Sequence, residues 1–214
     1  MYMITDFIQG SEGGGGFVMW FLLLCAVLGL ALILERLFSL FIKARLNPRS
    51  FLENLTSTVD SQGVGAGIAL CNDTPAPVAK ILKSVLEKAD KGKDAMEEVV
   101  SRNAAVELAF LDRGMALLNG LTTVAPFLGF LGTVIGMITA FAAVAAAGEV
   151  EPTIVASGIS TALITTKWGL MIATPLAIIH ILFSSKVAGY TRDMEEAASG
   201  LIDYIIEQYS KRAK

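Results

Sequence analysis

The fold is decided by one uncharged stretch, Met115 to Ala147, which reads MALLNGLTTVAPFLGFLGTVIGMITAFAAVAAA. A membrane-spanning helix needs about 20 mainly apolar residues. As a single helix, this run would extend about 50 Å at 1.5 Å per residue. We therefore expect a membrane helix that crosses the bilayer and projects beyond one face of it.

The stretch also contains small and hydroxyl-bearing residues that a helix facing only lipid would not need. Small residues let the backbones of neighbouring membrane helices approach closely. We therefore expect this helix to pack against others, with two interpretations left open. In one it lines a polar path, and in the other these residues serve packing alone. They are Gly120, Gly129, Gly132, Gly136, Thr122, Thr123, Thr133 and Thr139.

Composition supports an integral membrane protein and excludes several other classes. Of the 214 residues 54% are hydrophobic, and the mean hydropathy is +0.61. A net charge of −3 gives no indication of nucleic-acid binding. Cys25 and Cys71 do not form a disulfide framework, and the single histidine and scattered acids lack metal-ligand spacing. No enzyme motif such as HExxH or GxSxG is present, so we expect no enzymatic activity, cofactor or metal.

The sequence predicts an all-α membrane protein with three transmembrane helices, two of them long and extending into a cytoplasmic helical region. Charge and hydropathy divide the chain into seven segments. They are an outside N-terminal tail (1–16), a first transmembrane helix (17–42), a cytoplasmic helical domain (43–114), a second transmembrane helix (115–147), a short outside turn (148–153), a third transmembrane helix (154–185) and a cytoplasmic C-terminal helix (186–214).

Local signals refine this division. The tail has no positive charge at its start, so we expect it to be retained, with a short amphipathic helix around Tyr2, Met3, Ile4, Phe7 and Ile8. Glu35 and Arg36 end the first span and are placed where both can reach the headgroups. Pro48 is expected to end the first helix.

In the 43–114 domain, helical spacing occurs at 51–59, 78–92 and 94–114. Nothing stops the last piece at Gly114, which leaves open a helix running straight into the second span.

The basic residues predict the topology. All 17 lysines and arginines except Lys167 lie at or beyond the inner end of a span if 43–114 and 186–214 are cytoplasmic. The opposite side then carries only acids, as the positive-inside rule requires. The N-terminus is therefore expected outside and the C-terminus inside.

Polar residues at membrane depth are the candidate functional residues. Ser157, Thr161 and Thr165 share one helical face, and Thr166 widens this stripe. Threonine hydroxyls can bond to carbonyls of their own helix, so ordinary packing is one interpretation. The other is a hydroxyl-lined path in which Thr133 of the second span faces Thr166 of the third.

Lys167 lies thirteen residues into the third span, about 20 Å from its outer start. A charged lysine near the bilayer centre costs about 3 kcal/mol. It should therefore face a wet cavity, pair with a carboxylate or be neutral. Neither long span contains a carboxylate, so an acidic partner at that depth must come from elsewhere. Pro126 and Pro175 each remove one hydrogen bond within these spans.

Three motifs resemble the MotA/TolQ/ExbB proton-channel family. APFLGFLGTVIGMITAF (Ala125 to Phe141) is similar to the family's APLLGLLGTVxGMIxAF. GISTALITTKWGLMIATPLAI, in the third span, is similar to GIxEALxxTxxGLxxAIPAxI, and ALILERLFSL in the first resembles ALIIERLxxL. The three-span plan favours the ExbB/TolQ branch over the four-span flagellar stators.

The resemblance implies a homo-oligomeric, pentameric ring in the bacterial inner membrane. The ring would surround the helices of an ExbD- or TolR-like single-span partner that supplies a membrane aspartate, with a TonB- or TolA-like protein as a further partner. The proton motive force would then drive transport, envelope maintenance or motility. The polar residues of the family pore correspond to Thr133 and Thr166, with Thr161 and Lys167 also on the predicted path. Packing and kinks are expected at Pro126, Gly129, Gly132, Gly136 and Pro175.

Two departures from the family pattern affect this interpretation. The family's glutamate in the third span falls on Thr161, and Lys167 stands where a small or apolar residue is usual. A fixed positive charge beside the path would oppose cation entry unless it is neutralised or paired with the partner's aspartate. The alternative function is therefore a non-conducting membrane scaffold for a partner protein.

Overall fold

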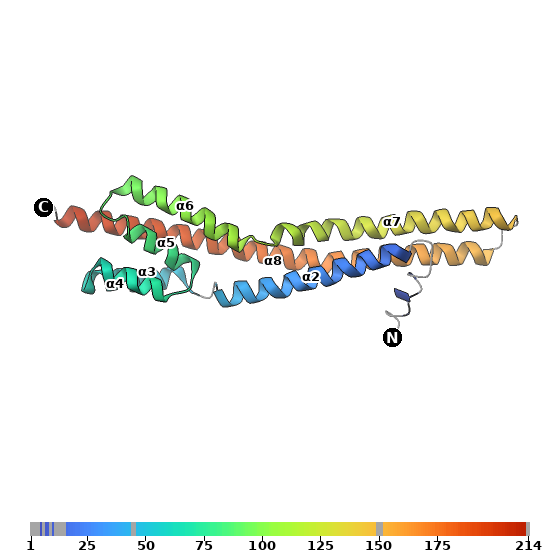
Figure 1. Ribbon diagram of the computed structural model, residues 1–214, viewed down its shortest axis with the longest axis horizontal. Coiled ribbons are helices and arrows are strands. Elements are labelled where there is room, and N and C mark those ends of the chain that lie inside the picture. The colour runs from blue at the N-terminus through green and yellow to red at the C-terminus, as the bar shows by residue number, and fades with distance from the viewer. Residues whose placement is uncertain are drawn as a thin grey trace. The chain divides into compact units, whose positions relative to one another are not determined.

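The computed structural model describes Thr5, Phe7, Ile8, Gly10 and residues 16–43, 46–148 and 152–212. Tyr2, Met3 and Ile4 of the expected N-terminal helix lie outside these residues. All regular secondary structure in the described ranges is helical (Figure 1). The helices are α2 (Gly16–Lys43), α3 (Pro48–Gln62), α4 (Val64–Asp73), α5 (Pro77–Leu86), α6 (Lys93–Leu111), α7 (Met115–Ala147) and α8 (Pro152–Arg212).

Among the described residues, three helices are long and apolar enough to cross a membrane, by length and composition: Gly16–Phe38, Met115–Ala147 and Val155–Gln208. Three membrane helices are the number that the sequence predicts. α8 continues without interruption from the expected third span into the C-terminal segment, so these two predicted segments are one helix of 61 residues.

The chain divides into two compact units, which we describe separately. The membrane unit comprises residues 1–34 and 114–182, and the α3–α6 unit comprises residues 35–113 and 183–214. α2 and α8 each contribute a segment to both units.

The α3–α6 unit is held together by large apolar side chains. Leu55 of α3, Leu82 of α5 and Leu201 of α8 are fully buried, and Ile81 and Met96 are 1% exposed. Burying a leucine-sized side chain stabilises a fold by roughly 1.5–3 kcal/mol. Interdigitated side chains therefore form the core of this unit.

Residues 64–73 form a helix, α4, that the sequence did not lead us to expect. Glycine lowers helix propensity by about 1 kcal/mol, and this segment contains Gly65 and Gly67. Packing outweighs that penalty, because a Cβ at Gly67 would lie 2.6 Å from Cγ2 of Val59 in α3. Only a residue without a side chain lets α4 approach α3 this closely.

The last helix before the second span does not run into it. α6 ends at Leu111, and Gly114 adopts φ 81°, a left-handed conformation that glycine takes at little cost. This glycine separates α6 from α7.

Pro48 also differs from its expected role, because it is the first residue of α3, where a proline needs no helical hydrogen bond.

Arg36 caps the end of α6 and does not reach out to the headgroups. Its side chain is 1% exposed, and Nη1 donates to the carbonyl oxygens of Leu111 (3.0 Å) and Phe110 (3.4 Å). Nε and Nη2 donate to the Glu35 carboxylate, each at 2.7 Å. The guanidinium thus satisfies carbonyls that the end of a helix leaves without internal donors.

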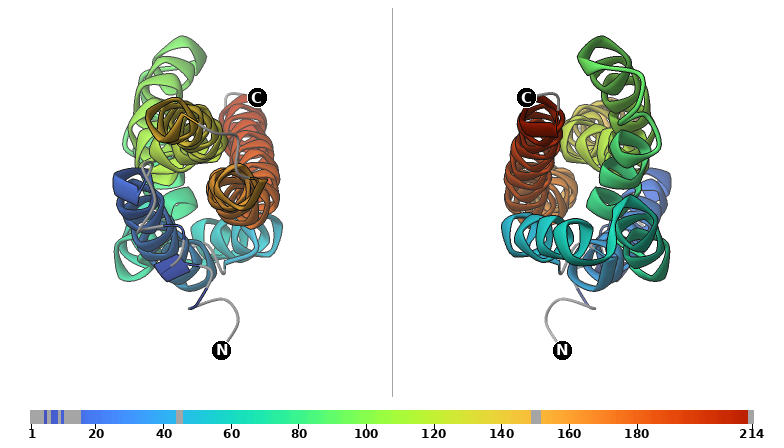
Figure 2. Two further views of the ribbon diagram at one scale, coloured as in Figure 1. Left: turned by 90° about the vertical axis from the view of Figure 1, so that its right-hand side faces the viewer. Right: turned by 90° about the vertical axis from the view of Figure 1, so that its left-hand side faces the viewer.

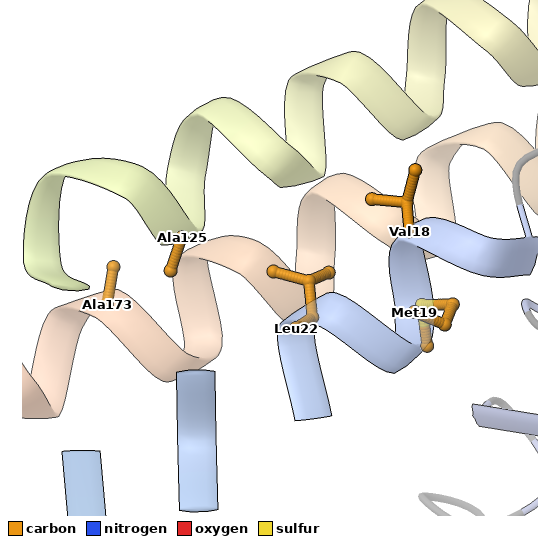
Figure 3. Packing of buried hydrophobic residues seen from close by; sticks show 5 residues of the cluster. All are labelled: Val18, Met19, Leu22, Ala125 and Ala173. Carbon is orange, nitrogen blue, oxygen red and sulfur yellow. The ribbon is translucent and has the colours of Figure 1, made fainter. Parts of the chain in front are cut away.

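The membrane unit contains α7 and segments of α2 and α8, which are neighbouring helices in the end-on views of Figure 2. α2 contributes Val18, Met19 and Leu22 to a buried apolar cluster (Figure 3). Ala125 of α7 and Ala173 of α8 complete it. The buried members from the two long helices are both alanines, while Leu128, Ile135, Trp168 and Ile172 of these helices are partly buried against the cluster.

Candidate functional site: a hydroxyl cluster between α7 and α8

The long helices of the membrane unit meet through residues that have little or no side chain. A Cβ at Gly129 would lie 3.0 Å from the Thr165 oxygen and 3.1 Å from Thr166 Cα. At Gly169 a Cβ would lie 2.7 Å from the Ala125 oxygen. Because these neighbours are backbone atoms, they cannot rotate aside. The helices are therefore in backbone contact at this level.

The other predicted packing glycines lie along the same contact. A Cβ at Gly132 would lie 2.5 Å from Thr165 Oγ1, and one at Gly136 would lie 2.8 Å from Ala162 Cβ. Pro126 and Pro175 lie inside helices that continue through them. Whether they kink these helices stays a prediction.

Three threonine hydroxyls gather where the backbones touch. The Gly129 carbonyl oxygen lies 3.1 Å from Thr165 Oγ1, 3.0 Å from Thr166 Oγ1 and 3.3 Å from Thr133 Oγ1. The hydroxyls of Thr133 and Thr166 are also hydrogen-bonded to each other. A second carbonyl, of Ala162, lies 2.7 Å from Thr165 Oγ1 and 3.2 Å from Thr133 Oγ1. We call Thr133, Thr165 and Thr166 the hydroxyl cluster.

The cluster offers more acceptors than protons. Each hydroxyl has one hydrogen to donate and lone pairs to accept with. Three hydrogens are shared among two carbonyl oxygens and the hydroxyls themselves, so several donor arrangements satisfy the same positions. A cluster of this kind can change its hydrogen bonding without moving the backbone.

The members of the hydroxyl cluster differ in how deeply they are buried. Thr165 is 1% exposed and is enclosed by the two helices, whereas Thr133 and Thr166 are half-buried. Thr133 and Thr166 therefore keep some exposed surface, whereas Thr165 keeps almost none. A partly exposed pair of threonines is suited to contact with water or with a polar group of another chain.

The other two predicted path residues do not join the cluster. Thr161 Oγ1 donates to the Ser157 oxygen of its own helix at 2.9 Å, the back-bonded arrangement that packing alone would explain. Lys167 is exposed and, as the residue after Thr166, lies about 100° further round the helix axis. The sequence indicated Thr165 as part of a hydroxyl stripe but not as a neighbour of Thr133.

The hydroxyl cluster has no ionisable group of its own. The sequence has no aspartate or glutamate in 115–147 or 152–185. Across the described ranges, no group of three or more His, Cys, Asp and Glu residues could hold a metal ion. The groups of the cluster itself are therefore hydroxyls and backbone carbonyls, which form hydrogen bonds but carry no charge.

Comparison with known families identifies the class of protein. A sequence model described as the MotA/TolQ/ExbB proton channel family matches residues 73–196, more than half of the chain. The match includes all of α7 and the membrane part of α8. The chain belongs to the MotA/TolQ/ExbB proton channel family.

Individual relatives carry ExbB names. A putative biopolymer transport protein ExbB homolog of Methanothermobacter thermautotrophicus is 26% identical over 173 residues, which are 81% of this chain and 61% of the relative. Biopolymer transport protein exbB1 of Vibrio cholerae is 28% identical over 165 residues, 75% of this chain and 72% of the relative. The match to biopolymer transport protein ExbB of Pseudomonas putida, 32% identical, covers 43% of this chain and 28% of that protein. The chain thus spans less than two thirds of the first and third of these relatives.

Proposed function

We propose that this protein is an inner-membrane subunit of an ion-driven motor. With an ExbD/TolR-like single-span partner it would form a proton channel whose current drives energy transfer to the cell envelope. Transport, envelope maintenance and motility are the processes open to such a device. In this proposal several copies, five by the family resemblance, form a ring, with each N-terminus outside and each C-terminus in the cytoplasm.

The single observation that carries the proposal is the hydrogen bond between the hydroxyls of the half-buried Thr133 and Thr166. These residues occupy the positions of the two polar pore residues in the resembling motifs. Their hydroxyls are hydrogen-bonded to each other across two helices, and both residues are half-buried. A carboxylate that reached this pair could accept a hydrogen bond from either hydroxyl when ionised and donate one when protonated.

The partner is needed because the two long spans contain no acid. A partner aspartate would take up a proton on one side of the hydroxyl pair and release it on the other. Each charge that crosses 100 mV releases about 2.3 kcal/mol. That free energy is available to move the partner helices relative to the ring.

The test is proton flux in proteoliposomes that contain the protein together with its single-span partner, under an imposed membrane potential. Thr166→Val removes the hydroxyl and retains the branched shape of the side chain. Thr139→Val is the matched control, because the Thr139 hydroxyl donates to carbonyls of its own helix, those of Ile135 (3.0 Å) and Gly136 (2.9 Å). We expect flux to fall to the level of empty liposomes in Thr166→Val and to persist in the control.

Normal flux in Thr166→Val, with normal assembly, would contradict the proposed path. No flux in the wild-type complex would favour the non-conducting scaffold.

A further inference from the structure

α2 has an apolar run that matches the thickness of a bilayer, whereas the apolar runs of α7 and α8 are longer. The uncharged run of α2, residues 17–34, extends about 27 Å, close to the roughly 30 Å of a hydrocarbon core. All 33 residues of α7 are uncharged, which gives about 50 Å. Part of α7, with the part of α8 beside it, must therefore lie outside the hydrocarbon when α2 lies across it.

The packing of the membrane unit shows at which end the excess lies. Leu22 of α2 belongs to the same buried cluster as Ala125 of α7 and Ala173 of α8 (Figure 3). α2 begins six residues before Leu22, a rise of about 9 Å. Over the same rise α7 reaches about residue 131 and α8 about residue 167. About 16 residues of α7 and about 15 of α8 extend past this level, roughly 22–24 Å.

A second contact gives the same register to within about one helical turn. A Cβ at Gly29 of α2 would lie 2.5 Å from Leu176 Cδ2 of α8. Counting back the same number of residues on both helices, the start of α2 is level with about residue 163 of α8. In Figure 1 the joined ends of α7 and α8 extend past the N-terminal end of α2. The excess length thus lies on the N-terminal side of α2, which is the outside in the proposed orientation.

The N-terminal tail packs against α2 and α8 at this level. The Phe7 ring lies edge-on to Trp20 of α2, with centroids 6.0 Å apart, and edge-on to Trp168 of α8, at 5.9 Å. A Cβ at Gly10 would lie 3.0 Å from Ile164 Cγ2 of α8. The tail is therefore held beside the first turns of α2.

The residue types at this level are those of a membrane interface. The tail carries Asp6, next to Phe7, and Glu12, two residues after Gly10. A charged carboxylate in hydrocarbon costs about 3 kcal/mol, so a segment flanked by two acids belongs in the headgroup region. Tryptophan is enriched at membrane interfaces, and the two tryptophans of the chain are the two that contact Phe7. Trp20 is 60% exposed.

We propose that Phe7, Trp20 and Trp168 mark the outer surface of the bilayer, with the exposed Trp20 in contact with the headgroup region of the lipid. We call these three residues the aromatic belt. The parts of α7 and α8 beyond the aromatic belt, residues 134–147 and 152–163, then project from the membrane as a helical hairpin. This inference rests on the proposed function only for the orientation, which makes the projecting side the outer one.

The aromatic belt also changes the expected depth of Lys167. Counting from the start of α8 places Lys167 about 20 Å into the membrane. Lys167 precedes Trp168, so the aromatic belt places it at the headgroups instead. A lysine side chain there can reach water and lipid phosphate without the cost of a charge near the bilayer centre.

The test measures the depth of Trp20 by fluorescence quenching. The full chain is reconstituted into phosphatidylcholine vesicles whose acyl chains carry bromine either near the headgroup or near the chain ends. Bromine quenches the tryptophans that it contacts. Wild type reports both tryptophans of the aromatic belt, and Trp168→Phe reports Trp20 alone. We expect bromine near the headgroup to quench both proteins more strongly than bromine near the chain ends.

Two further variants, made in a Trp20→Phe, Trp168→Phe chain, calibrate the depth. Val27→Trp lies seven residues after Trp20 on the same face of α2 and near the middle of the apolar run, at a position 57% exposed. Its quenching should show the reverse order. Ile138→Trp, at a position 63% exposed on the projecting part of α7, should be quenched by neither lipid.

Three results would overturn the proposal. One is stronger quenching of Trp20 by bromine near the chain ends, or by neither lipid. Another is an order that does not reverse between Trp20 and Val27→Trp. The third is quenching of Ile138→Trp, which would place the outer part of α7 within the bilayer.

The depth measurement is independent of the proton path, because it requires neither the single-span partner nor an ion gradient. If Trp20 is shallow and Thr166→Val conducts normally, the aromatic belt stands and the proton path fails. If Trp20 is deep and Thr166→Val is inactive, the path stands and the aromatic belt fails.

Discussion

The helices of the two units pack together in different ways. In the α3–α6 unit, large side chains such as Leu82 and Leu201 fill the core. In the membrane unit, α7 and α8 meet where Gly129 and Gly169 leave their backbones bare. The first arrangement gains stability by removing apolar surface from water. Lipid offers no such gain, so the second depends on close contact between backbones.

This difference predicts opposite sensitivities to substitution. The α3–α6 unit should be damaged by taking atoms away, and the membrane unit by adding them. Close helix contact also brings the hydroxyls of Thr133 and Thr166 together across two helices. The packing of the membrane unit is therefore part of its candidate site.

The largest effect is expected from truncation in the α3–α6 unit. Leu201→Ala removes a side chain that is fully buried, and core leucine truncations cost about 2–5 kcal/mol. Chemical denaturation of the detergent-solubilised protein measures this loss. Val106→Ala, at a position 64% exposed, is the control and should change stability by less than about 0.5 kcal/mol. Equal effects of the two variants would contradict a side-chain core.

Addition of one methyl group should damage the membrane unit. In Gly169→Ala, the new Cβ would lie 2.7 Å from the Ala125 oxygen and 3.0 Å from Gly129 Cα, both backbone atoms. Overpacking of this kind costs about 1–3 kcal/mol. A shift of the thermal unfolding midpoint, followed in the same detergent, measures it.

Gly120→Ala is the matched control for Gly169→Ala, because a Cβ at Gly120 meets nothing within 4 Å. This change should be neutral, or stabilising by up to about 1 kcal/mol through helix propensity. Tolerance of alanine at Gly169 as well would show that the backbones do not need this contact.

Loss of the buried guanidinium should loosen the end of α6. Arg36→Met leaves the Leu111 and Phe110 carbonyls without their donor, at a cost of about 1–3 kcal/mol. Hydrogen exchange of amides near residue 111 should accelerate. Arg49→Met breaks an exposed ion pair with Glu196, whose side chains are 68% and 59% exposed, and should cost no more than about 1 kcal/mol. Unchanged exchange in Arg36→Met would show that the cap is dispensable.

The smallest expected effect is a loss of folding stability at high pH, caused by the Cys71 thiol. Burial raises the pKa of the Cys71 thiol from 9.0 to about 11, although Lys83 opposes the rise. Below pH 9 the thiol is protonated in folded and unfolded chains alike. Above pH 9, the unfolded chain loses the proton first, so stability should fall as the pH rises from about 9 to 11.

In a Cys25→Ala background, maleimide should label folded protein at pH 8 far more slowly than unfolded protein. Similar rates would contradict burial of the thiol.

Much of the fold follows from charge and hydropathy. The uncharged run defines α7 because both of its ends fall at glycines, Gly114 and Gly148, which adopt positive φ values. α4 could not be predicted, because its glycines are unfavourable until Gly67 meets Val59. The burial of Arg36 depends on where α6 ends, which the sequence left open.

The candidate site, like the fold, was predictable from the sequence only in part. The opposition of Thr133 and Thr166 was predictable, since the motifs place both residues on the facing spans. The joining of Thr165 to the cluster depends on how closely Gly129 lets the helices approach. Spacing along one helix cannot give that distance. The orientation of Lys167 away from the cluster likewise depends on which face of α8 contacts α7.

The most direct test of the central claim is a double-mutant cycle on proton flux. Thr133→Val, Thr166→Val and the double variant are each reconstituted with the proposed single-span partner. If the two hydroxyls act as one pair, each single change should abolish most of the flux, and the second change should add little. Independent, multiplying losses would contradict a shared role, and wild-type flux in the double variant would exclude the hydroxyl pair from the path.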